Sequence, residues 1–306
     1  MKKHIVSTAW SIIALLLALG VAAAHDINGP NDCQRQQEDH GDAPEGVAAY
    51  PGGILGRFPT CGPIFLLSTQ ELDCPAISSP PGPDGSGYVM HLPEGSPYWL
   101  GCYIDAVGPM GLDQELEGKV NSSGALTSNC ANLSVDCWEP AFGMNFGQDE
   151  CYADGSDAGV TTPPAFVTCT PISIAYTTFN CDVARIVYLN VCVDFNHDGD
   201  WNDVLACPSV GGCAYEWAVK NASVTLPSGC GSLSTPSFLV GPIPGPTWFR
   251  ISLTNDPVHD DYPWNGSRTA PLGFFVGGET EDYPAIIGSA TAAVRRTWGQ
   301  MKTIYR

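Results

Sequence analysis

Residues 183–201 read VARIVYLNVCVDFNHDGDW, and this stretch decides the fold because it joins the clearest strand of the chain to its sharpest motif. On one face of the expected strand, from Val183 to Phe195, apolar side chains recur at every second position, which is typical of a β-strand. These side chains are Val187, Leu189, Val191, Val193 and Phe195. Ile186, Tyr188 and Cys192 share the opposite face, so we expect both faces of this strand to be covered.

Further strands are expected at residues 166–176, 215–226, 247–253 and 273–276, separated by turn residues at intervals typical of a sandwich. The chain has 34 Gly and 26 Pro residues among its 306, a density that breaks helices repeatedly and suits short strands. The sequence therefore predicts an all-β fold, a β-sandwich of short antiparallel strands in residues 161–288. A loop-rich, cysteine-containing, disulfide-bonded N-terminal region (25–160) precedes it, and a basic tail (289–306) follows it outside the sandwich.

The first 24 residues have the pattern of a secretory signal peptide. Lys2 and Lys3 give a positive start, residues 12–21 form an apolar stretch, and Ala22-Ala23-Ala24 offers small residues for cleavage. The alternative is an uncleaved membrane anchor, which the short apolar run with its glycine disfavours. We expect export, cleavage near Ala24, and a secreted or cell-surface mature chain without a transmembrane segment.

All 13 cysteines follow the predicted cleavage site, and in an exported chain this number indicates a disulfide framework. A zinc site is disfavoured, because the sequence has no Cys-x2-Cys pair and few histidines. Cys181 and Cys192 cannot pair along one straight strand. The odd number leaves one cysteine unpaired, which would allow a covalent dimer. The short-range candidates for pairing are Cys207–Cys213, Cys130–Cys137 and Cys61–Cys74.

The balance of charge bears on possible partners. Acidic residues outnumber basic residues 32 to 13, and the formal net charge at pH 7 is −19. Nucleic acid is therefore disfavoured as a partner, because phosphate binding needs a basic surface. Hydrophobic residues make up 44% of the chain, which is enough for a sizeable core.

Oxygen-bearing side chains occupy alternate positions at the end of the strand expected at residues 183–195. Such a pattern lets a chain curl around a hard cation. Asp194, Asn196 and Asp198 offer side-chain oxygens, Gly199 permits the sharp turn, and Asp200 offers a backbone carbonyl. The spacing matches the first half of a calcium loop, so Ca²⁺ is the expected ion. The alternative is an Asx-rich turn that holds no metal.

This loop alone offers too few ligands, because Leu205 stands at the twelfth position, where a calcium loop has a bidentate Glu. A remote motif, GGETEDY at residues 277–283, places three acids within four residues, which repel one another unless they are solvated or face a cation. We expect Glu281 or Asp282 from this motif to complete the Ca²⁺ site, with Asp203 as the local rival. Taken alone, the motif would be interpreted as a solvated loop.

Together these motifs resemble the GEVED domain family of secreted bacterial proteins, named for a C-terminal Gly-Glu-Val-Glu-Asp motif in which Thr280 here replaces the Val. The family pattern runs from a strand into Asp-Phe-Asn-x-Asp-Gly-x-Trp, passes through a Phe-Arg-aliphatic strand, matched here by residues 248–253, and ends at the acidic motif. This resemblance covers residues 161–288. It implies a β-sandwich surface module without assigned catalysis. A looser match lies upstream, in residues 39–44, at His91, in Leu100-Gly101 with Asp105, and in Asp154-Gly155.

Sequence signatures of common enzymes are absent: there is no His-Glu-x-x-His, no Gly-x-Ser-x-Gly, no phosphate-binding Gly-Lys loop and no dinucleotide fingerprint. Paired carboxylates for glycoside hydrolysis stay open, because acids are abundant and the sequence does not give their separation in space. We expect a non-enzymatic, calcium-stabilised module in adhesion or extracellular recognition. Its partner would be an extracellular glycan or a surface protein.

The alternative function is a secreted protein that binds or cleaves carbohydrate. Its candidate sugar-stacking platform combines flat apolar rings with polar edges. Core packing is the favoured role for Trp217 and Trp248. Tyr262 and Trp264 are the candidate ligand-facing aromatics, since Trp264 lies in a polar loop. The full platform comprises Trp201, Trp217, Trp248, Trp264 and Tyr262.

Overall fold

A computed structural model describes residues 41, 43–60, 89, 91–92, 97–102, 104–105, 108–109, 137–139, 144–146, 159–266 and 275–290. The expected signal peptide and the basic tail from residue 291 onward lie outside these residues. The described part consists of strands with one short helix, α2 (Tyr262–Asn265), which confirms the all-β prediction. Among the described residues, no helix is long and apolar enough to cross a membrane.

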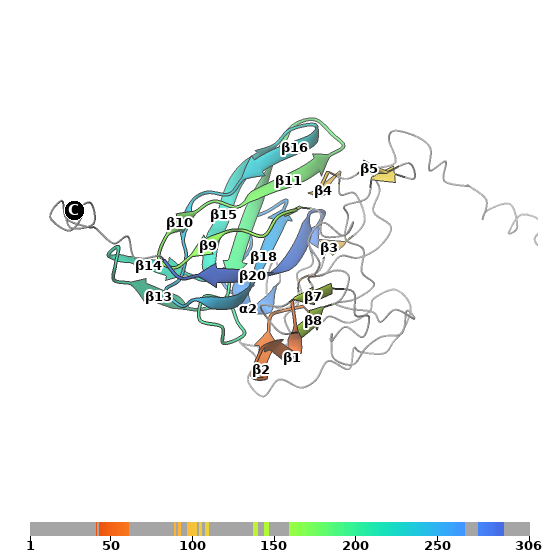
Figure 1. Ribbon diagram of the computed structural model, residues 1–306. Coiled ribbons are helices and arrows are strands. Elements are labelled where there is room, and N and C mark those ends of the chain that lie inside the picture. The colour runs from red at the N-terminus through yellow and green to blue at the C-terminus, as the bar shows by residue number, and fades with distance from the viewer. Residues whose placement is uncertain are drawn as a thin grey trace, which may run out of the picture.

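Two sheets form the body of the protein (Figure 1). The larger sheet has the order β15 (Trp217–Leu226), β12 (Arg185–Val193), β18 (Gly245–Thr254), β20 (Glu279–Gly288) and β9 (Phe166–Val167). Its neighbouring strands are antiparallel except for β9, which runs parallel to β20. The smaller sheet has the order β16 (Gly229–Ser234), β11 (Ala175–Asn180) and β4 (Tyr98–Leu100).

The remaining described strands pair two by two. The hairpin β1–β2 lies at the bottom of the view in Figure 1, near α2, at the opposite end from β16. The pairs are β1 (Glu45–Tyr50) with β2 (Ile54–Arg57), β3 (His91–Leu92) with β19 (Phe275–Val276), β5 (Ile104–Asp105) with β6 (Gly108–Pro109), β7 (Cys137–Glu139) with β8 (Met144–Phe146), β10 (Pro171–Ile172) with β17 (Phe238–Leu239), and β13 (Val204–Cys207) with β14 (Gly212–Tyr215).

The main core lies between the two sheets, because alternate residues of each strand point to the same face. On β12, the side chains Val187, Leu189, Val191 and Val193 are all buried in this core, as the period of two predicts. Phe249, Ile251 and Leu253 of β18 join them, and Tyr98, Leu100 and Tyr176 come from the smaller sheet. The arrangement is a β-sandwich.

A second core covers the outer face of the larger sheet. Cys192 of β12 and Trp248 of β18 are buried there against Ala49, Tyr50 and Phe58 of the N-terminal segment. Both faces of β12 are therefore covered near its C-terminal end. The cover stops short of the other end, where Ile186 is 62% exposed.

The single strand expected at residues 166–176 is wrong. The structure instead has β9, β10 and the start of β11 in this range. Cys169 interrupts the strand, because its φ is 52°, a left-handed conformation that extended chains do not adopt. Two residues later, Pro171 has no N–H to donate to a sheet. A disulfide from Cys169 to Cys207 fixes this turn.

The acidic motif is a buried strand, so the solvated-loop interpretation is wrong. Four consecutive residues of β20 are fully buried: Glu279, Thr280, Glu281 and Asp282. Glu279 accepts a hydrogen bond from the Leu100 N–H. Thr280 contacts the His91 ring nitrogen Nε2 at 2.9 Å, and Glu281 accepts from the Tyr283 hydroxyl at 2.6 Å and from the Gly159 N–H at 3.1 Å.

Asp282 forms a buried ion pair with Arg250 of β18. Its two carboxylate oxygens lie 2.7 Å from Arg250 Nε and 2.6 Å from Arg250 Nη2. The same guanidinium donates to the Pro59 carbonyl at 3.0 Å and the Thr60 hydroxyl at 3.1 Å. The Ala43 N–H donates to Asp282 Oδ2 at 2.8 Å. Both charges are thus satisfied by groups of the N-terminal segment as well as by each other.

The described part of the chain contains two disulfides with both partners placed, Cys102–Cys230 and Cys169–Cys207, and Cys181 is disulfide-bonded as well. The expected pair Cys207–Cys213 is wrong, because Cys207 bonds Cys169 and Cys213 is free. The other two expected pairs involve positions outside the described residues. Cys192 is a second free cysteine, so the described part already exceeds the single unpaired thiol that the odd number required.

Loss of the Asp282 carboxylate should destabilise the fold strongly. In Asp282→Ala the Arg250 guanidinium stays buried without its partner, which typically costs about 3–5 kcal/mol of unfolding free energy. The measurement is denaturant unfolding of the purified protein. Asp260→Asn removes the exposed pair between Lys220 and Asp260 and serves as the control, with no expected change. Equal stability of the two variants would contradict a structural role for the buried pair.

The two free thiols should differ in reactivity, because Cys213 is exposed and Cys192 is fully buried. Burial also raises the pKa of the Cys192 thiol far above its ordinary value, which suppresses the reactive thiolate. Alkylation of the native protein followed by peptide mass spectrometry should label Cys213 within minutes and Cys192 only after denaturation. Fast native labelling of Cys192 would show that the second core is open.

Candidate metal centre

The candidate site is the loop of residues 194–203 that joins β12 to β13. Two of its residues have positive φ, His197 at 63° and Gly199 at 97°. A Cβ atom at position 199 would lie 2.2 Å from the Leu55 carbonyl oxygen, so only glycine fits there. The Gly199 carbonyl in turn accepts a 2.7 Å hydrogen bond from the Arg57 N–H, which fastens the loop to β2.

Asp194 holds the loop in place through hydrogen bonds to its backbone. Its buried carboxylate accepts hydrogen bonds from the N–H groups of His197 (2.6 Å) and Gly199 (2.9 Å) and from the Tyr50 hydroxyl (2.7 Å). Burial is the main reason that the pKa of Asp194 is raised to about 7, although these donors oppose the shift. Asp194, the first residue of the motif, therefore stabilises the loop from the inside through hydrogen bonds to its backbone.

Glu216 supports the loop in the same way, although neither sequence motif includes it. It lies between β14 and β15, and its buried carboxylate accepts from the N–H groups of Phe195 (2.9 Å), Asn196 (3.3 Å) and Asp203 (2.9 Å). Burial, followed by the nearby Asp194, raises its pKa to about 9. No local sequence pattern signals this role, because the three N–H donors lie 13 to 21 residues earlier in the chain.

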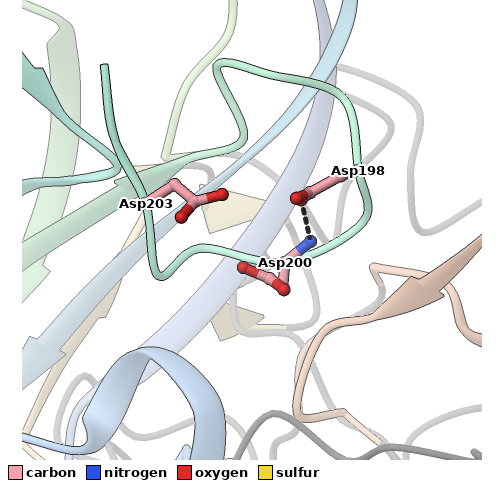
Figure 2. A group of neighbouring side chains, drawn as sticks. All are labelled: Asp198, Asp200 and Asp203. Carbon is pink, nitrogen blue, oxygen red and sulfur yellow. Dashed lines mark hydrogen bonds between the residues drawn. The ribbon is translucent and has the colours of Figure 1, made fainter. Parts of the chain in front are cut away.

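Three carboxylates converge on the outer side of the loop. Figure 2 shows Asp198, Asp200 and Asp203 pointing toward one another, and their candidate ligand oxygens all lie within 4.8 Å of each other. The side-chain amide of Asn196 donates to Asp198 at 3.0 Å and to Asp203 at 2.6 Å. Burial, with a contribution from the neighbouring acids, raises the pKa of both Asp198 and Asp200.

The structure brings together only part of the predicted ligand set. Asp198 and Asp200 lie in the carboxylate group with Asp203, the local rival, and Asn196 contacts this group. Glu281 and Asp282 are held elsewhere. In the larger sheet, Asp282 of β20 pairs with Arg250 of β18, and Arg250 pairs with Cys192 of β12. The acidic motif therefore lies two strands away from β12, the strand that leads into the loop. Completion of the site by the acidic motif is therefore wrong in this structure, because those carboxylates are already bonded within the sandwich.

The two candidate ligand-facing aromatics separate as well. Tyr262 is 1% exposed, and its hydroxyl lies 2.6 Å from the Ser252 hydroxyl, so it is a core residue rather than a ligand contact. Trp264 is half-buried and lines a cavity together with Trp201 and Trp217. Trp248 is fully buried, as core packing predicted.

Comparisons with known proteins leave the family open. No protein-family model matches the chain, so the GEVED resemblance stays a prediction, and no curated protein matches. One similar solved structure is a family 123 glycoside hydrolase from Clostridium perfringens, with TM-score 0.22 and 11% identity over 42% of this chain; the match spans only 22% of that hydrolase. Another is a PapD-like domain of human CEP192, with TM-score 0.22 and 10% identity, covering 51% of this chain and 96% of that domain. Neither likeness is strong enough to carry an argument about function.

The metal-free protein should lose stability as the pH rises. Asp194 and Glu216 have folded pKa values of about 7 and about 9, above their ordinary 3.8 and 4.5, so the folded state holds their protons more tightly than the unfolded state. Their protonated forms therefore stabilise the fold at low pH, and this contribution is lost as the pH rises through the folded pKa values.

Thermal melting of metal-free protein between about pH 5 and about pH 9 measures this effect. The wild-type melting temperature should fall across the range. Glu216→Gln carries a neutral amide that does not titrate, so its melting temperature should depend less on pH and its stability relative to the wild type should increase as the pH rises. Parallel curves for the two proteins would show that Glu216 is not a source of the pH dependence.

Proposed function

We propose that this protein is an exported, disulfide-bonded β-sandwich module that acts by binding rather than catalysis, in adhesion or extracellular recognition, and that Ca²⁺ stabilises it. The observation that carries the metal assignment is the convergence of Asp198, Asp200 and Asp203 within 4.8 Å. Like charges at this separation repel, and a divalent cation between them removes the repulsion.

The donor set fits Ca²⁺. The three side chains that converge in the loop all offer carboxylate oxygens, and Ca²⁺ binds six to eight such hard ligands. The two cysteines that flank the loop in sequence are not available as soft ligands, because Cys192 is buried in the second core and Cys207 is bonded to Cys169. When bound, the ion would supply charge neutralisation and would join the end of β12 to the start of β13.

A non-catalytic role agrees with where the acids of the acidic motif lie. Glu279, Glu281 and Asp282 are fully buried and accept hydrogen bonds from the chain itself, so a substrate could not reach them. Glu216 and Asp194 are likewise occupied by backbone N–H donors. Export is supported by the five disulfide-bonded cysteines among the described residues, since disulfides persist in oxidising compartments.

Calcium should raise the melting temperature. At free Ca²⁺ about a hundredfold above its dissociation constant, the gain in unfolding free energy would be about 2.7 kcal/mol. For a domain of this size that corresponds to roughly 5–10 °C. Extracellular modules bind in the ~0.1–1 mM range, so melting in EGTA should be compared with melting in several millimolar Ca²⁺.

Three variants make this test specific to the loop. Asp198→Ala should lose the calcium response, whereas Glu281→Gln should lower the melting temperature in both conditions but keep the response. Asp182→Asn, an exposed acid beyond the far end of β12, is the matched control and should behave like the wild type. If Ca²⁺ leaves the wild-type melting temperature unmoved, the loop is an Asx-rich turn and the metal assignment fails.

A further inference from the structure

A cavity of about 210 Å³ lies beside the candidate metal centre. Asp203 belongs to both, since its carboxylate is part of the acidic group and its side of the loop forms one wall of the cavity. Other lining residues come from α2 and from Asp260, which lies just before it. The lining residues are Trp201, Asn202, Asp203, Val204, Tyr215, Trp217, Asp260, Pro263 and Trp264.

Aromatic rings dominate the cavity, and the fold holds them in place. Trp217 donates its indole N–H to Asn190 at 3.1 Å and packs against the buried Tyr262, with 5.9 Å between ring centroids. Trp264 lies in the single turn of α2 (Tyr262–Asn265), which Gly266 caps in a left-handed conformation. Tyr215 also lines the cavity and is 58% exposed. Rigid, partly exposed rings present flat apolar faces with little entropy left to lose on binding.

Hydrogen-bond donors and acceptors lie close to these rings. Asp203 and Asp260 offer carboxylate acceptors, and the Asn202 amide offers both a donor and an acceptor. At the rim, the Lys220 ammonium lies 2.7 Å from Asp260 and 4.4 Å above the Trp217 ring, so a donor is close to the acceptors. A ligand that carries several hydroxyl groups next to an apolar face would match this combination.

We propose that this cavity binds one neutral sugar ring of an extracellular glycan. One face of a pyranose consists of C–H groups, which pack on Trp or Tyr, and its rim of hydroxyls both donates and accepts hydrogen bonds. The volume is smaller than the ~300–1,000 Å³ of sites for drug-sized ligands, which fits a single ring. The carboxylates and the net charge of −19 disfavour acidic sugars.

This assignment names the ligand class for the recognition role proposed above. It rests on the proposed Ca²⁺ site, because Asp203 belongs both to that site and to the cavity. With Ca²⁺ bound, Asp203 would be fixed and its charge balanced, which favours a neutral polyol over an organic cation. Without the ion, Asp203 keeps its charge and is repelled by Asp198 and Asp200, which lie next to it outside the cavity lining. Binding should therefore be tighter in calcium than in EGTA.

Isothermal titration calorimetry of the full chain tests the proposal, with methyl glycosides of glucose, galactose and mannose and with N-acetylglucosamine as probes. At least one should bind saturably in calcium. Trp264→Ala should weaken that binding by about tenfold or more, which is ~1.4 kcal/mol, and Trp264→Phe should restore part of it. Ile186→Ala, on the exposed far end of β12, is the control and should bind like the wild type.

Three results would overturn the assignment. In the first, no glycoside binds at tens of millimolar. In the second, choline binds while the glycosides do not, which would make the cavity a cation site. In the third, Trp264→Ala and Ile186→Ala bind equally well, which would place the sugar elsewhere. Melting of the same samples separates the two proposals: a calcium response without sugar binding refutes only the cavity, and Trp264-dependent sugar binding without a calcium response refutes only the metal centre.

Discussion

The buried ion pair between Arg250 and Asp282 is the interaction on which the rest of the structure depends. A guanidinium and a carboxylate inside a protein cost several kcal/mol each in lost hydration unless every donor and acceptor is satisfied. Here the satisfaction comes from Pro59, Thr60 and Ala43, together with the Trp201 ring, which lies 4.6 Å from the guanidinium carbon. The N-terminal segment is therefore part of the sandwich, since without it the pair would face water or an empty space.

The same segment extends this dependence to the metal loop. The Tyr50 hydroxyl donates to Asp194 and accepts from the Trp248 N–H at 3.1 Å, and the Trp248 indole donates to the Ala49 carbonyl at 3.0 Å. These bonds tie β1, β18 and the loop into one connected network. A boundary drawn at residue 160 would cut between segments that share a core, so an isolated fragment from residue 161 would expose Arg250, Asp194 and Trp248.

The sequence predicts those parts of the molecule whose determinants are local. The alternation in β12 and the spaced oxygens after it are both periodic patterns. The structure follows the alternation, but of the spaced acids only Asp198 and Asp200 converge, whereas Asp194 accepts hydrogen bonds within the fold. The acidic strand could not be predicted in this way, because a run such as Glu279 to Asp282 contradicts the usual alternation of buried apolar residues. Its donors lie far away in sequence, 239 residues for Ala43 and 179 for Leu100. Glu216 was missed for the same reason, since its three N–H donors belong to a loop 13 to 21 residues earlier.

The loop divides its acids into two groups with different physical tasks. Asp194 and Glu216 lie inside, accept five backbone N–H groups between them and so fix the path of the chain whether or not an ion is present. Asp198, Asp200 and Asp203 lie outside, where the fixed path makes their carboxylates converge. Convergence of like charges is unfavourable by itself, so the inner hydrogen bonds hold the outer acids in an arrangement that a cation relieves. The loop is therefore ordered when the sandwich folds, before any ion binds. An ion that binds does not have to order the loop, and its affinity is higher for that reason.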